Sequence, residues 1–172
     1  MTPVQPAKKR ACAICDACVL INLSVVNELR LLGGLEDFRF YVPQAVLDEL
    51  RQESHRKEVR TALDRLWLRK ATLDSEEEDA LAQELRSLYG AGESACLAIA
   101  QVRGWHVVTD ESGALAGEIG RRVGVGRQIG TVAILAVAVR RKLLTVPQAD
   151  AYKVKLEAHK FKIKIRSFAD IL

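Results

Sequence analysis

The sequence predicts an α/β fold with a mainly parallel central sheet, and three observations lead to this. Short β-rich runs alternate with amphipathic helical stretches, which is typical of a parallel sheet covered on both faces. The 172 residues suit one domain with a sizeable core. Charged residues make up 28% and hydrophobic types 49%, a globular rather than a disordered balance. We therefore expect one domain over residues 11–172, preceded by a flexible basic segment over residues 1–10.

The strands and helices can be placed from composition and breaking residues. Strong strand candidates are residues 11–15, 38–42 and 105–109, with weaker ones at 124–129 and 161–166. Helices are expected over residues 44–51, 55–66 and 93–102. Pro43 suits a first helical turn, and Ser75 precedes acids that favour a helix start. Gly90 interrupts a helical run, and Gly104 separates the next helix from its strand.

Apolar runs are too short to cross a bilayer, which needs roughly 18 residues. The run ILAVAV at 134–139 ends in Arg140, Arg141 and Lys142. The polar N-terminal MTPVQPAKKR does not resemble a secretory signal. We expect a cytoplasmic protein without membrane contact, with its four cysteines reduced.

The net charge of +4 is unevenly distributed. From Arg140 onward there are nine Lys and Arg against three acids, whereas residues 74–84 hold six acids and no base. The basic C-terminal part could meet phosphates or could be an ordinary solvated surface, and its composition favours neither.

Three cysteines surround one aspartate in the stretch CAICDACVLINL, residues 12–23. Cys12 and Cys15 would point to opposite faces of a strand, and the next cysteine and proline of a bacterial iron–sulfur run are missing. We expect these cysteines to be small apolar residues that fill space in the core. The alternative interpretation is a thiolate metal or redox site.

The aspartate in this stretch is the more informative residue. Asp16 lies where a buried strand ends and a helix begins, the edge at which open α/β sheets bind ligands. Glu49, Glu93 and Asp110 occupy comparable positions in VPQAVLDEL, GAGESACLAIA and after WHVVT. Each alone has a structural explanation, such as Asp110 capping the helix that follows, but together they could converge.

At these positions the sequence resembles the PIN domains, and within them the toxin-like VapC type of prokaryotes. The resemblance covers roughly residues 12–145. It is carried, in family order, by ICDACVLINL, VPQAVLDEL, GESACLAIA, VVTDESGALAGEIGRRVGV and IGTVAILAVAVRRKLLT. The resemblance implies a PIN-like three-layer α/β/α sandwich.

The resemblance further implies a metal-dependent endoribonuclease, the toxin of a type II toxin–antitoxin pair. Its acidic quartet would be Asp16, Glu49, Glu93 and Asp110, which would bind Mg²⁺ or Mn²⁺ and serve as the catalytic residues. The neighbouring acids Asp48 and Glu111 are alternatives if the alignment is shifted by one position.

The same resemblance suggests the partners: an RNA substrate, a cognate antitoxin protein and a second copy of the chain. The apolar stretches LINLSVVNELRLL and VAILAVAV also favour a homodimer. The alternative function is a catalytically degenerate PIN-like module that binds RNA or a protein.

Three positions bear on activity. Many members carry Thr or Ser directly after the first aspartate, where this chain has Ala17 and Cys18. An arginine often found after the fourth acid is replaced near Leu115, which leaves Arg121 and Arg122 as the nearest bases. Thr131 matches the family, either assisting at the edge of the site or capping a helix.

Overall fold

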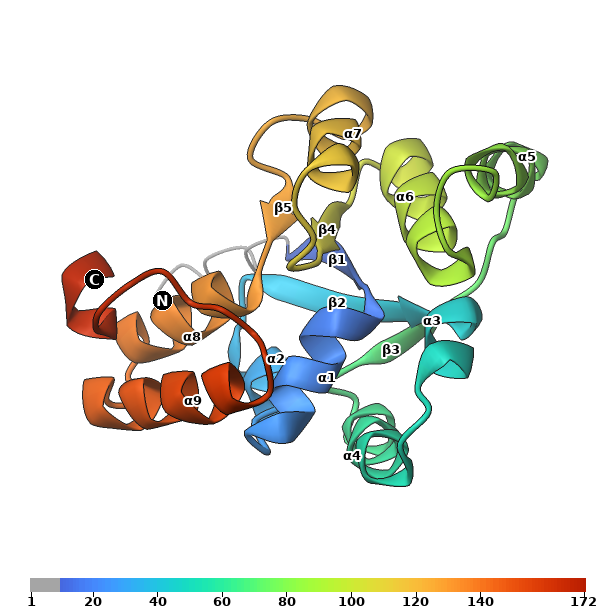
Figure 1. Ribbon diagram of the computed structural model, residues 1–172. Helices are drawn as coiled ribbons and strands as arrows, with labels where there is room; N and C mark the ends of the chain where they lie inside the picture. The colour runs from blue at the N-terminus through green and yellow to red at the C-terminus, as the bar shows by residue number, and fades with distance from the viewer. Residues whose placement is uncertain (1–9) are drawn as a thin grey trace, which may run out of the picture.

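A five-stranded parallel sheet forms the centre of the protein, in the order β3-β2-β1-β4-β5. The computed structural model describes residues 10–172 (Figure 1). Every neighbouring pair of strands is parallel, which confirms the predicted α/β class. The strands are β1 (Ala11–Cys15), β2 (Phe38–Pro43), β3 (Arg69–Ala71), β4 (His106–Val108) and β5 (Gln128–Ile129).

Helices cover the sheet in two layers, so the architecture is the three-layer sandwich expected from the resemblance. Figure 1 shows α5, α6 and α7 on one side of the sheet and α1, α2, α4, α8 and α9 on the other. The helices are α1 (Ala17–Val25), α2 (Arg30–Gly34), α3 (Gln44–Glu49), α4 (Glu53–Asp64), α5 (Glu76–Leu85), α6 (Ala91–Arg103), α7 (Ala114–Arg122), α8 (Thr131–Arg140) and α9 (Val146–Ala158). A 3₁₀ turn, η1 (Phe168–Ile171), follows near the C-terminus.

The central strand β1 is buried from both sides. Ala13, Ile14 and Cys15 have no exposed surface, which explains why this strand reads as a continuous apolar run. The expected breaks are also present: the Ser75 side chain accepts a hydrogen bond from Glu78 N at the start of α5, and Gly104, at φ 66°, ends α6 before β4.

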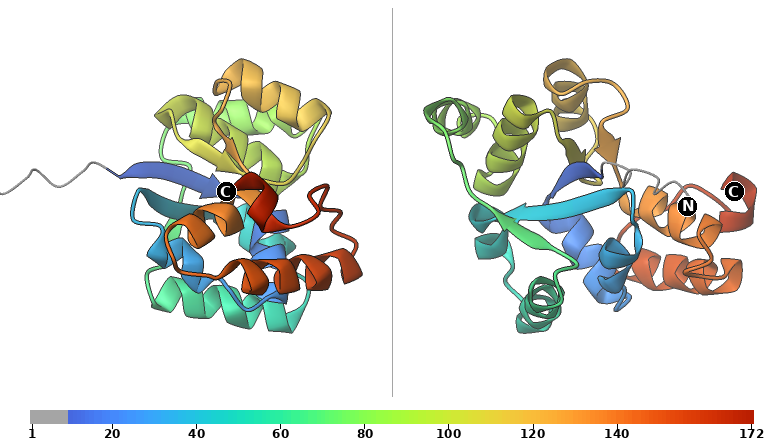
Figure 2. Two further views of the ribbon diagram at one scale, coloured as in Figure 1. Left: turned by 90° about the vertical axis from the view of Figure 1, so that its left-hand side faces the viewer. Right: turned by 180° about the vertical axis from the view of Figure 1, so that it is seen from behind.

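The prediction of a strand at residues 161–166 is wrong. Its side chains alternate between buried and exposed, as in an extended chain, but the segment forms no ladder with the sheet. It follows α9 and runs over the helical layer, where no strand edge is available (Figures 1 and 2). The short edge strand β3 was missed because Arg69 and Lys70 give it a polar composition.

The ends of the chain limit two other expectations. Most of the flexible segment expected at residues 1–10 lies outside the described residues, and Arg10 itself is exposed. Within residues 10–172, no helix is both long enough and apolar enough to cross a membrane.

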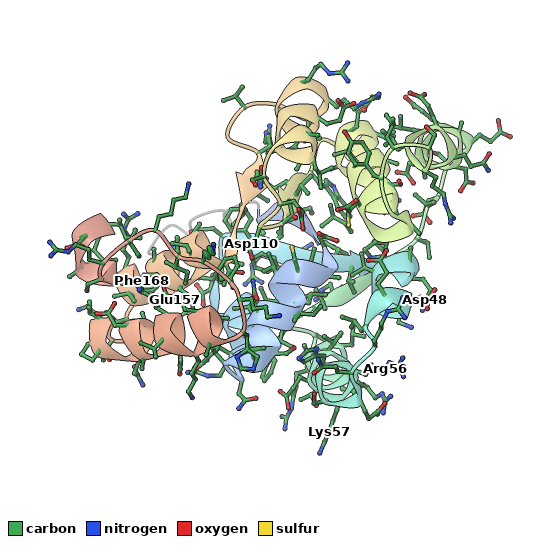
Figure 3. The ribbon with its side chains drawn as sticks, in the orientation of Figure 1. Asp48, Arg56, Lys57, Asp110, Glu157 and Phe168 are labelled. Carbon is green, nitrogen blue, oxygen red and sulfur yellow. The ribbon has the colours of Figure 1, made fainter. Side chains whose placement is uncertain are left out.

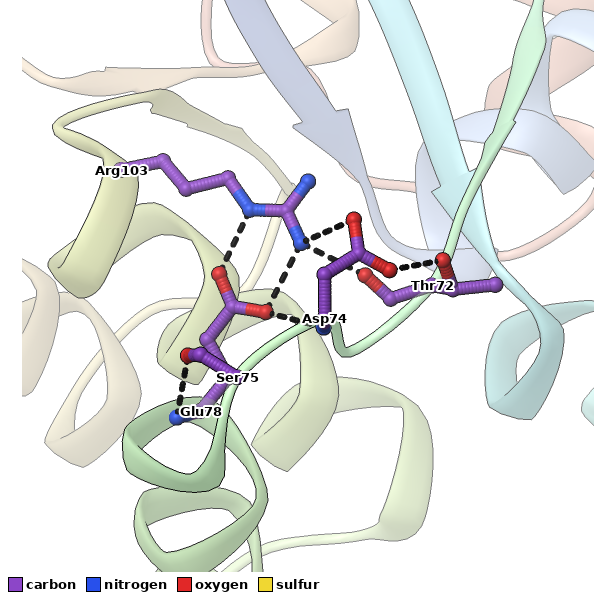
Figure 4. A network of polar contacts seen from close by, with 5 residues as sticks. All are labelled: Thr72, Asp74, Ser75, Glu78 and Arg103. Carbon is purple, nitrogen blue, oxygen red and sulfur yellow. Dashed lines mark hydrogen bonds and ion pairs between the residues drawn. The ribbon is translucent and has the colours of Figure 1, made fainter.

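A partly buried ion pair joins α5 to α6 (Figure 4). Arg103 donates from Nε to Glu78 Oε1 at 2.6 Å and from Nη2 to Oε2 at 2.8 Å. The same Nη2 donates to the carbonyl of Thr72 at 2.6 Å, and Asp74 lies 3.2 Å away. The hydrogen bond from Arg103 is the largest influence lowering the pKa of Glu78, whose side chain is 3% exposed.

Replacing Arg103 by methionine should cost about 3 kcal/mol of unfolding free energy at pH 7, because it leaves a buried carboxylate without its cation. The pair contributes stability above the ordinary glutamate pKa of 4.5 and loses it as the pH falls through the lowered pKa of Glu78. The difference in unfolding free energy between wild type and variant should therefore narrow as the pH falls below 4.5. Urea unfolding at several pH values measures this difference in unfolding free energy, with Arg65→Met as a control at an exposed position. Equal losses in both variants would contradict the role of the pair.

Candidate active site

Two of the predicted acids lie at the carboxyl ends of neighbouring strands. Asp16 directly follows β1, and Asp110 follows β4 after one intervening residue, Thr109. The backbone N–H of Asp16 donates to Val108 O at 2.9 Å, which fixes the two strand ends side by side. The topology of a parallel sheet thus brings these carboxylates to one edge.

The Asp16 carboxylate is 4% exposed and is held by three neutral donors. Its Oδ1 accepts from Ala17 N at 2.8 Å, which caps α1. Its Oδ2 accepts from the Thr109 hydroxyl at 3.1 Å and from the Cys18 thiol at 3.3 Å. Asp16 therefore has a fixed orientation without a cationic partner among the described residues.

Asp110 ties together three segments. Its Oδ1 accepts from Thr131 N at 2.7 Å, and its Oδ2 accepts from Asn22 Nδ2 at 2.9 Å and from the Thr131 hydroxyl. Asp110 thus caps α8, whereas the sequence suggested the helix that follows it, α7. Figure 3 places this carboxylate near the middle of the molecule.

Glu49 and Glu93 meet near the start of α6. Glu49 Oε1 accepts from Gly92 N at 2.7 Å, and Glu93 Oε2 accepts from Gly90 N at 3.0 Å. A Cβ at Gly90 would lie 3.7 Å from both of these oxygens, so the two carboxylates approach a common space. Glu49 comes from the end of α3 and Glu93 from the first turn of α6.

The two alternative acids behave differently from each other. Asp48 accepts from Gln44 Nε2 at 2.9 Å on the exposed side of α3, at the periphery of the molecule (Figure 3). Glu111 lies close to the predicted acids. Burial raises its pKa, and the negative charges of Glu93, Asp16 and Asp110 raise that pKa further. The charges of three predicted acids therefore reach Glu111.

The carboxylates do not form a closed coordination group as they lie. Across the part of the chain that the structure describes, no three Asp, Glu, His or Cys side chains could together hold a metal ion. The donor chemistry nevertheless fits a hard cation. A carboxylate has about four acceptor sites, of which Asp16 and Asp110 each use three and Glu49 one. Mg²⁺ takes oxygen ligands and usually keeps several waters, so widely spaced carboxylates suit it.

A family model described as a PIN domain matches residues 12–172. The chain belongs to the PIN-domain family. No curated protein and no solved structure matches it. PIN domains are generally nucleases that use divalent metals, so membership supports nuclease activity for this chain.

The alternative hypothesis, a thiolate site formed by Cys12, Cys15 and Cys18, is not supported. Within residues 10–172 no three His, Cys, Asp or Glu side chains lie so that they could together hold a metal ion, Cys12, Cys15 and Cys18 included. Burial also raises the pKa of Cys15 well above the ordinary value and that of Cys18 to about 12, which disfavours free thiolates. Cys15 is the expected apolar filler. Cys18 is more than a filler, because its sulfur also lies 3.3 Å from the Thr109 hydroxyl and accepts from Asp110 N at 3.3 Å.

Neither of the two arginines considered as substitutes for the family's missing arginine is free. Leu115 is buried, and Arg121 and Arg122 both pair with Glu118 on their own helix. Thr131 is the first residue of α8 rather than its cap, and its hydroxyl donates to Asp110. Of the two roles considered for Thr131, contact with the site is the one the structure contains.

Sequence reasoning missed three supporting residues. Asn22 binds Asp110, Thr109 binds Asp16, and Gln128 Nε2 donates to the carbonyls of Thr109 at 3.1 Å and Glu111 at 2.8 Å. Asn22 had a visible signal, a lone amide within the apolar run VLINL. Gln128 had none, because its contact depends on how β5 lies beside β4.

Gly92→Ala should displace Glu49 while leaving the fold intact. A Cβ there would lie 2.8 Å from both Glu49 oxygens, so the carboxylate must move. Nuclease activity should fall at least tenfold, although Gly to Ala within a helix normally stabilises by about 0.5–1 kcal/mol. Gly117→Ala in α7 is the matched control, since nothing lies within 4 Å of its Cβ position. Cleavage assays and thermal melts measure both; equal activity of the two variants would show that Glu49 need not stay in place.

Proposed function

We propose that this PIN domain is a Mg²⁺- or Mn²⁺-dependent endoribonuclease that hydrolyses RNA phosphodiester bonds. One observation carries the proposal. Of the buried acids in residues 10–172, Glu28, Glu78 and Glu118 each have an arginine partner, whereas Asp16 has only neutral donors. A buried carboxylate without a fixed cation is costly unless a cation arrives from solution.

The residues proposed to hold the metal are Asp16, Glu49, Glu93 and Asp110, with Glu111 beside them. A bound Mg²⁺ or Mn²⁺ would lower the pKa of a coordinated water and offset charge on the phosphate oxygens. The oxygen donors of these carboxylates support these two hard ions over softer ones.

The chain's own residues supply orientation. Ala17 N and the Thr109 hydroxyl fix Asp16, and Gly92 N fixes Glu49. Asn22 and Thr131 fix Asp110. Pre-oriented carboxylates lose less entropy when the substrate phosphate arrives, and such positioning is a large part of phosphoryl-transfer catalysis.

The biological setting is proposed on family grounds. We propose a cytoplasmic toxin of a type II toxin–antitoxin pair that acts on RNA and is restrained by a cognate antitoxin protein. A gene for a small DNA-binding antitoxin directly upstream would support this setting. Its absence would remove the toxin role and leave the nuclease activity.

A second candidate is a catalytically degenerate module that binds RNA or a protein without cutting. Ala17 favours it, because the hydroxyl common after the first aspartate is lost. The absence of a closed coordination group within residues 10–172 points the same way. A cleavage assay with purified protein and added metal separates the two functions.

Asp16→Asn isolates the charge at the centre of the site. In chelator the variant should be at least as heat-resistant as wild type, because like charges no longer repel and asparagine caps a helix as well as aspartate. With Mg²⁺ or Mn²⁺ the order should reverse, because wild type gains binding free energy. RNA cleavage should drop at least tenfold, which corresponds to about 1.4 kcal/mol of lost transition-state stabilisation.

Asp48→Asn is the matched control, since Asp48 is exposed and bonded only to Gln44. It should cleave and melt like wild type. If Asp16→Asn cuts RNA as fast as wild type and gains the same stabilisation from metal, Asp16 is structural and the proposed site is wrong.

We also propose a homodimer, as is common among PIN relatives. The apolar stretches that suggested it are largely used within the chain, since Leu20, Leu23, Ile134 and Leu135 are buried. Exposed apolar residues lie elsewhere, such as Val154 on α9 at 66%. Light scattering across micromolar concentrations should give twice the chain mass of 19.0 kDa. A constant monomer mass would rule the dimer out.

A further inference from the structure

The segment between α9 and η1 carries an unusual row of cations. In KFKIKIR, residues 160–166, the bases Lys160, Lys162, Lys164 and Arg166 are all exposed. The intervening Phe161, Ile163 and Ile165 pack on the hydrophobic core. We call residues 160–166 the basic rail. Lys160 lies in the turn that ends α9, at φ 66°. From Phe161 to Arg166 the alternation is that of an extended chain, in which every second side chain points the same way.

The rail is anchored at both ends. Before it, Phe161 N donates to Leu156 O at 3.0 Å at the end of α9. After it, Asp150 accepts from the Ser167 hydroxyl at 2.7 Å and from Phe168 N at 2.8 Å, and Phe168 is fully buried. These two hydrogen bonds lower the pKa of Asp150, which therefore remains an ionised anchor at neutral pH. The backbone that carries these basic side chains is therefore held at both of its ends.

The charges of the rail are not neutralised within the described chain. Its four basic side chains form no ion pair or hydrogen bond with residues 10–172, unlike Arg103, Arg121 and Arg122. The acids of this part of the chain have other partners: Asp150 is the anchor, Asp170 accepts from Ser167 N at 3.2 Å, and Glu157 pairs with Lys153 at 2.9 Å. A line of unpaired cations favours a polyanion as its partner.

The rail faces the side of the molecule on which the site lies. The left view of Figure 2 shows β1 pointing toward the side that carries this segment, and in Figure 1 the segment crosses in front of α8. The first residue of α8, Thr131, binds Asp110. A strand of RNA bound along the rail would therefore lie on the same side of the molecule as the carboxyl edge of the sheet.

We propose that the basic rail binds the phosphate backbone of single-stranded RNA and guides it to the acidic site, an inference that rests on the proposed ribonuclease function for its choice of ligand. Alternate residues of an extended chain are about 6.5 Å apart, so Lys162, Lys164 and Arg166 have a spacing that suits successive phosphates of an extended strand. The one aromatic side chain of the rail, Phe161, is half-buried and packs against the core. The contact is therefore with phosphates and independent of base sequence.

The test replaces Lys160, Lys162, Lys164 and Arg166 together by glutamine. The matched control replaces Arg39, Arg65, Arg69 and Lys142, which are exposed and form no ion pair with another described residue. Both variants lower the net charge from +4 to zero. Binding of a fluorescent single-stranded RNA is measured by anisotropy in chelator at several salt concentrations, so that no cleavage interferes.

The rail variant should bind RNA at least tenfold more weakly, and the slope of log affinity against log salt should flatten by about 3, or ~0.7 per lost phosphate contact. The control variant should stay near wild type, and replacing the three rail lysines by arginine should preserve binding. In cleavage assays with metal, the rail variant should show a raised KM and an unchanged kcat.

Equal weakening in the rail and control variants would overturn the proposal, because net charge alone would then explain binding. It would also fail if wild type bound poly-glutamate through the rail and did not bind RNA, which would indicate an acidic protein partner. Rail-dependent RNA binding by a wild type that cuts nothing would sustain the rail while refuting the proposed nuclease.

Discussion

The neutral hydrogen bonds that hold the Asp110 carboxylate are the constraint on which this site depends. Asn22 and Thr131 donate to it from α1 and α8, which lie 88 and 21 positions away in the sequence. Asp16 is held in the same manner by a backbone N–H, a hydroxyl and a thiol. None of these donors carries a positive charge, so the carboxylates are oriented while their negative charge remains uncompensated. A salt bridge in their place would fix the side chains equally well and would compete with any incoming cation.

Much of this arrangement could be predicted from the sequence, because the relevant signals are local. The buried strand before Asp16, the β-rich run before Asp110 and Gly104 after α6 each have a clear composition, and a parallel sheet brings strand ends together. The contacts that hold the acids could not be predicted in the same way. Gln128 reaches the loop after β4 only because β5 pairs with β4, and a pairing between distant segments leaves no periodic pattern in either.

The segment at residues 161–166, which was predicted to be a strand and is not one, also shows how tertiary contacts limit prediction from sequence. The alternation of apolar and basic residues predicts a strand, but a strand also needs a neighbour with free backbone groups. The neighbour here is a helical layer, so the alternation separates core from solvent without a ladder. Local pattern fixes the conformation of such a segment, and tertiary context decides whether it joins a sheet.

The two edge strands have a consequence for how copies of the chain meet. At three and two residues, β3 and β5 expose very few unpaired backbone groups, and Arg69 and Lys70 place charge along the β3 edge. Long, flat and uncharged edges are what allow sheets of different molecules to fuse into aggregates. Within residues 10–172 the sheet offers almost no such template, so edge-to-edge association of copies should be disfavoured.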